Sequence, residues 1–165
     1  MVLIAIACQA AQVEVAPSKA RSQVAVDEAS RMVAEQFIYV LNAHNENALI
    51  ELLVSSFTWV GGDQFGGKDS FVRIFKGDWT HRKGWHITTQ DLGTAYLVDG
   101  LLQDSAPAPS AKVVTPLVRL KVTEEYESPY VVQGPLKVVH NYPIYLVIQQ
   151  SKVFRVIFGP SSSAP

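Results

Sequence analysis

The order of the elements predicted between Asp27 and Gly77 constrains the fold of this chain more than any other feature. Apolar periodicity in this segment predicts a helix, a shorter helix, a strand, a glycine-rich turn and a third helix, and the rest of the chain has the pattern of strands. A parallel sheet would need crossover helices, and no segment after Gly77 has helical period. The sequence therefore predicts an α+β protein, with three N-terminal helices packed on a strongly curved antiparallel sheet.

The three helices are predicted from apolar stripes and from the residues at their ends. The first helix is predicted over residues 24–43. The second is predicted to begin after Asn45, whose side chain can accept a hydrogen bond from a free N–H group of the first turn. The third is predicted over residues 69–76, with Gly77 as the residue that ends it.

The strands are predicted from alternation of apolar and polar residues. They cover residues 57–60, 85–91, 94–103, 118–123, 138–149 and 153–158. Leu92-Gly93 is predicted as a hairpin turn, and Ser151-Lys152 as a tight turn before the last strand. The polar segment 124–134 is predicted to be irregular, and Pro143 is expected to mark an edge, a bulge or a bend.

Length and composition indicate one folded domain. A chain of 165 residues, of which 48% are hydrophobic and 18% charged, is long enough to bury a core, and we place the domain at residues 24–160. Residues 161–165 are predicted to be a frayed, disordered tail. The net charge is -1 and no basic stripe is present, which argues against nucleic acid as a partner.

The N-terminal segment has the features of a tether. Cys8 is the only cysteine, so no internal disulfide can form. It follows the apolar run 2–7, which resembles the end of a bacterial lipoprotein signal, where the cysteine is lipidated. Residues 1–23 would then be an export signal and flexible tether, and the protein would meet the membrane only through a lipid on Cys8. The segment lacks a basic start, so the alternative is an apolar N-terminus on a cytoplasmic protein.

Four stretches of the sequence resemble the nuclear transport factor two-like superfamily. They are FIYVLNAHNENALIELL (37–53), FTWVG (57–61), FGGKDSFVRIF (65–75) and YLVIQQSKVFRVIFG (145–159). This superfamily has a cone-shaped α+β fold and includes ketosteroid isomerase and the SnoaL-like polyketide cyclases. The resemblance implies a cone that encloses a cavity, and a homodimer that forms through the sheet.

The ketosteroid isomerase pattern is only partly present. Such a site needs a carboxylate base and two hydrogen-bond donors that hold a developing enolate. By the local match, the tyrosine of the first helix falls at Phe37, the base at Gly62 and the protonated acid near Tyr145. Phe37 cannot donate a hydrogen bond and Gly62 has no carboxylate, although Asp63 is the next residue. Two of the three roles are therefore lost or displaced.

A related acid–base site can still be written from nearby residues. His86 is predicted to open a strand directly after the third helix, in a region that can line the cone. We hypothesise that Asp63 and His86 act as acid and base, with Tyr39 or Tyr145 orienting the ligand. The alternative is that Asp63 forms a turn, His86 is a surface residue and the tyrosines serve packing.

Aromatic residues are the strongest sequence argument for a pocket. Candidate ligand-binding residues in the region that lines the cone are Phe37, Tyr39, Trp59, Phe71, Phe75 and Trp85. Apolar walls with a few polar groups are typical of small-molecule sites. The alternative is that these side chains simply fill the core.

Metal and nucleotide sites are disfavoured. His81, His86, Asp78 and Asp91 do not have a spacing that places their side chains on one face. The segment 62–69 (GDQFGGKD) approaches a phosphate-binding loop but has Asp69 where such loops carry Ser or Thr. No metal and no cofactor is predicted.

The sequence leaves three functions open. The favoured one is a SnoaL-like domain that binds a small apolar molecule. The second is an isomerase, dehydratase or cyclase that works by acid–base chemistry in the cone. The third is a non-catalytic module that dimerises through its sheet.

Overall fold

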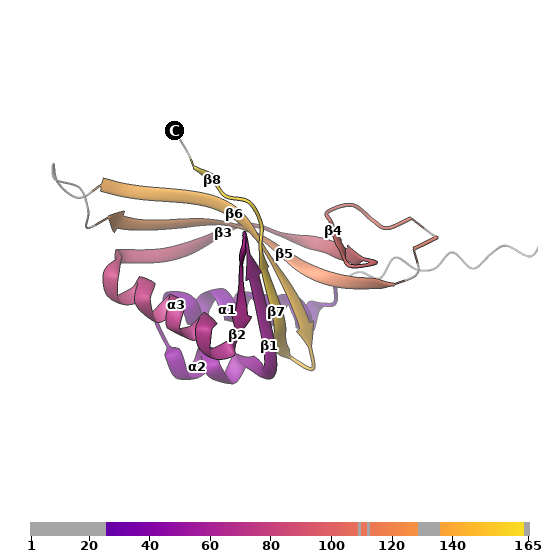
Figure 1. Ribbon diagram of the computed structural model, residues 1–165, viewed down its shortest axis with the longest axis horizontal. Coiled ribbons are helices and arrows are strands. Elements are labelled where there is room, and N and C mark those ends of the chain that lie inside the picture. Colours follow the sequence, from indigo (N-terminus) through magenta and orange to yellow (C-terminus); the bar gives the residue numbers. More distant parts are fainter. Residues whose placement is uncertain (1–25, 109, 112, 129–135, 164–165) are drawn as a thin grey trace, which may run out of the picture.

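The computed structural model describes residues 26–108, 110–111, 113–128 and 136–163. Within these residues, three helices pack against one side of a single, strongly bent eight-stranded sheet (Figure 1). The helices are α1 (Glu28–Asn42), α2 (Glu46–Leu52) and α3 (Lys68–His81). The predicted α+β architecture, a helical layer over a curved sheet, is confirmed.

The first two helices begin where their capping residues predict. Asp27 accepts a hydrogen bond from the Ser30 backbone N–H at 2.7 Å, and Asn45 accepts one from Ala48 at 3.0 Å. The third helix differs from its prediction, since it passes Gly77 and continues for one more turn to His81. That additional turn carries Asp78 and Arg82 at its end, and the two side chains pair at 3.2 Å.

The strands form one continuous path. They are β1 (Leu53–Gly61), β2 (Gln64–Gly67), β3 (Lys83–Val98), β4 (Leu101–Gln103), β5 (Val114–Ser128), β6 (Leu136–Gln149), β7 (Lys152–Phe158) and β8 (Ser162–Ser163). Their order in the sheet is β2-β1-β7-β6-β5-β3-β4, and β8 pairs with β6 outside this path. All pairs are antiparallel except β1 with β7, which are parallel and joined by most of the chain.

The predicted hairpin at Leu92-Gly93 is wrong, because β3 runs through it as one strand. A Cβ atom on Gly93 would lie 2.7 Å from a guanidinium nitrogen of Arg119, so this glycine makes room for a cross-strand side chain. The chain turns instead at Asp99 and Gly100, both at positive φ.

The polar segment after residue 123 is also more regular than predicted. Strand β5 continues to Ser128, with Glu124 opposite His140 and Tyr126 opposite Val138 on β6. The turn between β6 and β7 is at Gln150-Ser151, one residue before the predicted one. Ser162 and Ser163 of the predicted tail form β8.

Pro143 lies where β6 changes its neighbour. Strand β7 ends with Phe158 opposite Ile144, and β8 begins with Ser162 opposite Asn141. Pro143 has no N–H group to donate, and its carbonyl accepts a hydrogen bond from Gly159 at 2.8 Å. The proline therefore lies between the part of β6 that pairs with β7 and the part that pairs with β8.

Helix α1 is fastened to the exposed edge of β3 by one side chain. The Asn42 amide donates to the Ile87 carbonyl and accepts from the Ile87 N–H, both at 2.7 Å. Because β4 pairs only with residues 96–98 of β3, these backbone groups have no strand partner on that side. Asn42 thus takes the place of a neighbouring strand.

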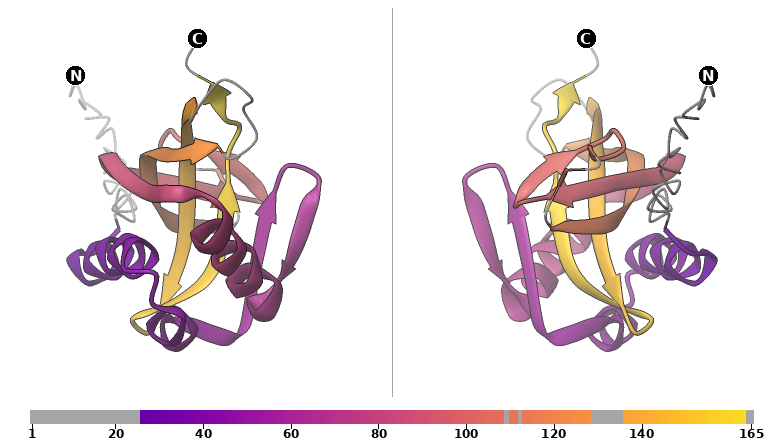
Figure 2. Two further views of the ribbon diagram at one scale, coloured as in Figure 1. Left: turned by 90° about the vertical axis from the view of Figure 1, so that its left-hand side faces the viewer. Right: turned by 90° about the vertical axis from the view of Figure 1, so that its right-hand side faces the viewer.

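The core lies between the helices and the concave side of the sheet. Its fully buried members include Phe37 and Leu41 of α1, Phe71 of α3 and Leu120 of β5. A smaller cluster of Ala95, Leu117, Tyr145 and Val147 lies apart from this core. Figure 2 shows α3 running beside the β1–β2 hairpin, which closes one side of the cone. None of the helices described is long and apolar enough to cross a membrane.

Candidate functional site

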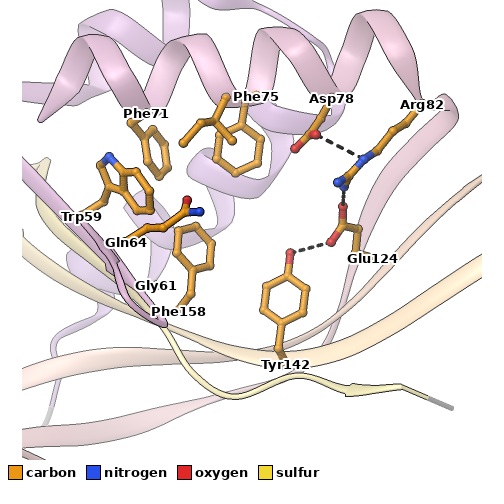
Figure 3. Close-up of a pocket in the computed structure, with 11 residues that line it drawn as sticks. Trp59, Gly61, Gln64, Phe71, Phe75, Asp78, Arg82, Glu124, Tyr142 and Phe158 are labelled. Carbon is orange, nitrogen blue, oxygen red and sulfur yellow. Dashed lines mark hydrogen bonds and ion pairs between the residues drawn. The ribbon is translucent and has the colours of Figure 1, made fainter. Parts of the chain in front are cut away.

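A cavity of about 230 Å³ opens between α3, the β1–β2 hairpin and strands β5 to β7. Its walls are formed by Trp59, Gly61, Gln64, Phe71, Ile74, Phe75, Asp78, Arg82, Glu124, Tyr142 and Phe158. Figure 3 shows that these residues divide into two groups, with aromatic rings at one end and charged groups at the other. The cavity therefore offers an apolar wall and a polar end to the same ligand.

The apolar end is a cluster of packed rings. Phe71 is central, with ring-centroid distances of 4.8 Å to Phe75, 6.2 Å to Phe158 and 6.4 Å to Trp59. Tyr142 joins the cluster at 6.1 Å from Phe158 and connects it to the polar end. These distances lie in the range of favourable aromatic pairs, so the wall is fixed by its own packing.

Trp59 is held in this wall by a hydrogen bond to α3. Its indole N–H donates to the Ser70 hydroxyl at 2.9 Å, and that hydroxyl donates to the Gly67 carbonyl at 2.8 Å. Gly66 lies directly beside the pair, where a Cβ atom would come within 2.6 Å of the indole nitrogen. Gly66 therefore permits close approach of the backbone to Trp59.

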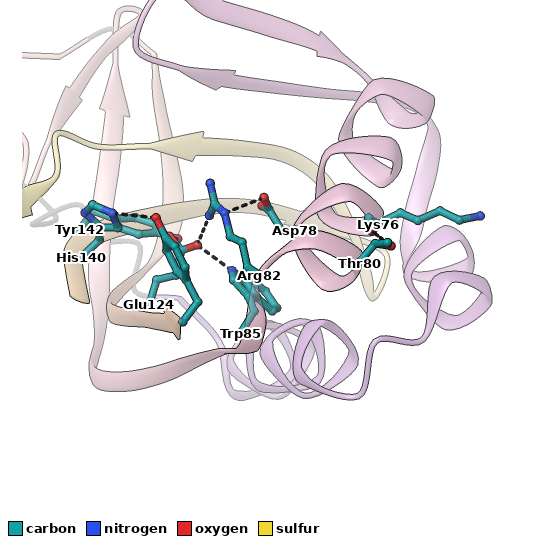
Figure 4. Close-up of polar contacts among 9 residues, drawn as sticks. Lys76, Asp78, Thr80, Arg82, Trp85, Glu124, His140 and Tyr142 are labelled. Carbon is teal, nitrogen blue, oxygen red and sulfur yellow. Dashed lines mark hydrogen bonds and ion pairs between the residues drawn. The ribbon is translucent and has the colours of Figure 1, made fainter. Parts of the chain in front are cut away.

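The polar end combines residues from three elements (Figure 4). Arg82, at the end of α3, donates from Nε to Asp78 at 3.2 Å and from Nη1 to Glu124 of β5 at 2.7 Å. The Tyr142 hydroxyl of β6 donates to the second oxygen of Glu124 at 3.2 Å. The guanidinium also lies over the Tyr126 ring, with its carbon 4.4 Å from the centroid.

Glu124 is the anchor of this network. Its side chain is only 10% exposed, and a carboxylate at that depth requires several donors. It has three, because the buried indole N–H of Trp85 donates to it at 2.6 Å in addition to Arg82 and Tyr142. The alternation of β5 that turns Leu120 and Val122 into the core also turns Glu124 inward.

The local environment perturbs two of these groups. Burial raises the pKa of Asp78 above its ordinary value; the neighbouring Glu124 raises it further, and Arg82 opposes the rise. Burial and the charge of Glu124 also raise the pKa of the Tyr142 phenol, so Tyr142 stays neutral and donates a hydrogen bond to Glu124. Asp78 is thus a candidate for proton exchange in the cavity, whereas Tyr142 serves as a hydrogen-bond donor.

No protein-family model matches the chain, and no curated protein matches its sequence. Solved structures match its fold. A protein described as a SnoaL-like polyketide cyclase from Shewanella denitrificans is 9% identical, with a TM-score of 0.60 over 82% of this chain and 92% of that one. A protein of ketosteroid isomerase-like fold from Catenulispora acidiphila, in complex with trimethylamine, is 13% identical, with a TM-score of 0.53 over 78% and 84%. An LEH-like epoxide hydrolase from M. tuberculosis is 14% identical, with a TM-score of 0.53 over 79% and 80%.

The chain has the nuclear transport factor two-like fold. The resemblance seen in the sequence is confirmed at the level of the fold, which is what matches at such low identity establish. The cavity described above lies between α3 and the bent sheet of this fold, and is called the cone cavity below.

Three of the six aromatic residues predicted to bind a ligand line the cone cavity, namely Trp59, Phe71 and Phe75. Trp85 does not line the cavity; it packs edge-on against Phe75, with ring centroids 5.6 Å apart, and donates a hydrogen bond to Glu124. Phe37 is fully buried in the core under α1, whereas Tyr39 is 73% exposed on the outer side of that helix. Two positions two residues apart on a helix face opposite sides, so the apolar periodicity that turns Phe37 inward turns Tyr39 outward.

The structure does not bring the predicted catalytic residues together. Asp63 is exposed at the turn between β1 and β2, and His86 is exposed on the face of β3 opposite to Trp85. The His86 ring is 2.9 Å from the Gly84 carbonyl and 3.8 Å from Glu125, both outside the cone. Tyr145 packs in the smaller cluster and donates to Asp104 at 3.4 Å. Cys8, the predicted lipidation site, lies outside the described residues.

The polar residues of the cone were missed for identifiable reasons. Asp78 and Arg82 are four residues apart on a helix, but this pairing is visible only if the helix continues past Gly77. Glu124 and Tyr142 follow the inward alternation of their strands, but Glu124 was assigned to an irregular segment. Among the described residues, no group of three or more His, Cys, Asp or Glu side chains forms a metal site.

Proposed function

We propose that this protein binds a small, largely apolar molecule in the cone, with one polar group of the ligand at the Asp78–Glu124 end. The observation that carries the proposal is the division of a single cavity into an aromatic wall and a charged end. Small-molecule sites have this composition, with a few placed polar groups that fix the orientation of an apolar body.

The size of the cavity limits the ligand. Its volume of about 230 Å³ is below the roughly 300–1,000 Å³ of typical ligand pockets, so the ligand is smaller than a drug-sized molecule. Gln64 lies at the exposed rim on the β1–β2 hairpin, which places the entrance beside that hairpin. A compact ring or branched chain fits these dimensions better than an extended one.

Acid–base catalysis in the same cavity is the second candidate. Two carboxyl groups whose environments differ can divide the roles of acid and base. Asp78, with its raised pKa, would be the acid, and Glu124, which accepts three hydrogen bonds, would be the second carboxyl group of the pair. This assignment replaces Asp63 and His86 as the reacting groups of an isomerase, dehydratase or cyclase.

A cavity-blocking variant tests the binding function. Cyclohexanol serves as the probe, and thermal unfolding is followed by circular dichroism with and without it. A ligand present at 100 times its Kd stabilises a protein by about 2.7 kcal/mol, so binding raises Tm. We expect cyclohexanol to raise Tm in the wild type and not in Gln64→Trp, whose indole would fill the entrance.

Phe65→Trp is the matched control. Phe65 is adjacent in sequence and 82% exposed, and it does not line the cavity, so this variant should respond like the wild type. Equal responses of the two variants, or no response of the wild type, would overturn the binding proposal. For catalysis, Asp78→Asn should retain binding and lose turnover of any substrate found, and unchanged turnover would exclude Asp78 as the acid.

A further inference from the structure

The hydrogen-bonding groups and the charge of the cone identify a class of ligand. On the basis of the binding function proposed above, we infer that the cone selects an ammonium ion attached to a compact apolar body, in preference to a neutral alcohol or a carboxylate. Three features of the described residues support this inference: the free acceptors, the net charge and the aromatic wall.

Two side chains at the polar end have already used their only donor. The Tyr142 hydroxyl has one O–H group, which donates a hydrogen bond to Glu124, and the single N–H group of the Trp85 indole donates to the same carboxylate. Arg82 gives Nε–H to Asp78 and Nη1–H to Glu124. Arg82 retains three further N–H groups. The polar end also has free acceptors, chiefly the second carboxylate oxygen of Asp78 and the Tyr142 oxygen. A ligand that satisfies them must itself donate hydrogen bonds.

The charge at this end is negative. Asp78 and Glu124 bring two negative charges and Arg82 brings one positive charge, and no Lys or His is among the residues that line the cavity. A carboxylate ligand would add a third negative charge in a partly desolvated site. An ammonium ion would instead neutralise the excess, and it would donate up to three hydrogen bonds to the free acceptors.

The aromatic wall also favours a cationic ligand. Ring faces carry a negative quadrupole potential and attract cations, and the attraction grows where water is excluded. Tyr142 lies between the Glu124 carboxylate and the Phe158 ring, so a cation near Tyr142 can touch an aromatic ring and remain close to a carboxylate. A neutral alcohol can donate one hydrogen bond here but gains nothing from the charge or the rings.

The titration of Asp78 fits this assignment. The groups that face it are Arg82 on its own helix and, across the cavity, Glu124 of β5 and Tyr142 of β6. Burial and Glu124 raise the pKa of Asp78 because the site disfavours an uncompensated second negative charge. A bound cation compensates that charge. Its affinity should therefore fall when the pH is lowered through the pKa of Asp78, while the affinity of a neutral ligand should not change.

A matched series of ligands tests the inference. Cyclohexylamine, which is protonated at pH 7, cyclohexanol and cyclohexanecarboxylate share one ring and differ in charge. Isothermal titration calorimetry with the full chain should give a Kd for cyclohexylamine at least tenfold below that for cyclohexanol, and weaker binding still for cyclohexanecarboxylate. Asp78→Asn should weaken cyclohexylamine binding about tenfold and change cyclohexanol binding by less than twofold. Asp63→Asn, at an exposed turn outside the cavity, should change neither.

The outcomes separate the two proposals. If cyclohexanol binds as tightly as cyclohexylamine in the wild type, the inference about the cation fails and the binding function stands. If none of the three binds, both fail. Should the amine bind more tightly than the alcohol but equally well to wild type and Asp78→Asn, the cation is held elsewhere and the inference is overturned. The wild-type series remains decisive even if the Asn variant does not fold, and cyclohexanol binding by that variant reports an intact cavity.

Discussion

The hydrogen bond between Trp85 and Glu124 gives the sharpest test of how the cone is built. Glu124→Leu removes the acceptor of three donors, and each donor responds differently. The Trp85 N–H is left without a partner in a side chain that is 2% exposed. Arg82 keeps Asp78 and is itself 35% exposed, and the Tyr142 hydroxyl faces the cavity, where water can reach it.

The expected cost is therefore dominated by the indole. An orphaned buried donor costs about 1–3 kcal/mol, and we expect a total loss of roughly 2–3 kcal/mol for Glu124→Leu. For a domain of this size such a loss lowers Tm by roughly 4–12 °C. Trp85→Phe removes the donor instead, and leaves Glu124 with Arg82 and Tyr142. Because the double variant leaves neither group of this bond unpaired, its loss should be smaller than the sum of the single losses by about 1–2 kcal/mol.

The wild type, the two single variants and the double variant form a double-mutant cycle. Urea unfolding followed by far-ultraviolet circular dichroism measures the stability of all four proteins without relying on tryptophan fluorescence. Glu125→Leu is the control, since Glu125 is the neighbouring acid but pairs with Lys137 outside the cone, and it should have a much smaller effect. Losses that add within about 0.5 kcal/mol would mean that the two side chains are not coupled, and the reasoning about Glu124 as an anchor would be refuted.

Three further predictions concern the frame of the cavity. Asn42→Ala should cost about 1–3 kcal/mol in urea unfolding, because it orphans the backbone N–H and C=O of Ile87; a loss below 0.5 kcal/mol would contradict that role. Gly66→Ala should cost about 1–3 kcal/mol, since its methyl group would meet Trp59, whereas in Gly67→Ala the nearest atom is 3.7 Å away; equal losses would argue against the close approach. The folded-state pKa of Asp78 is raised above 3.8, so wild-type stability is lost as pH rises from 3.8 through that pKa. As the pH rises through this interval, Asp78→Asn should therefore gain stability relative to the wild type, as measured by urea unfolding. A relative loss of stability would mean that burial does not raise the pKa of Asp78.

The architecture could be predicted because its signals are local and repeated. Asp27 and Asn45 cap their helices as expected, and the apolar stripe of α1 is long enough to be unambiguous. The turns were harder, because a glycine can serve several purposes. Gly93 makes room for Arg119 and Gly77 lies inside α3, whereas the turn between β3 and β4 uses Asp99-Gly100, a pair typical of tight hairpins.

The polar end of the cavity could not be predicted from the sequence, because it depends on three long-range arrangements. Asp78 and Arg82 meet Glu124 only after α3 has been extended and β5 has been placed opposite it. In the sequence, Glu124 is one of two adjacent glutamates, and only strand register distinguishes it from Glu125. Asp63 and His86 were favoured because they are near motifs in the sequence, and nearness along the chain is a poor guide to which side chains face a cone.

Asp78 and Arg82 lie at the end of α3, so the site is sensitive to the number of residues in that helix. An α-helix rotates by about 100° per residue, and the phenylalanine ring at position 75 and the carboxylate at position 78 face the same hollow only at their present spacing. Deleting one residue between them would leave helix and sheet intact but swing the charged pair around the helix axis, toward solvent. Proteins that share this scaffold could thus gain or lose such a site through a single codon insertion or deletion, with no change in overall shape.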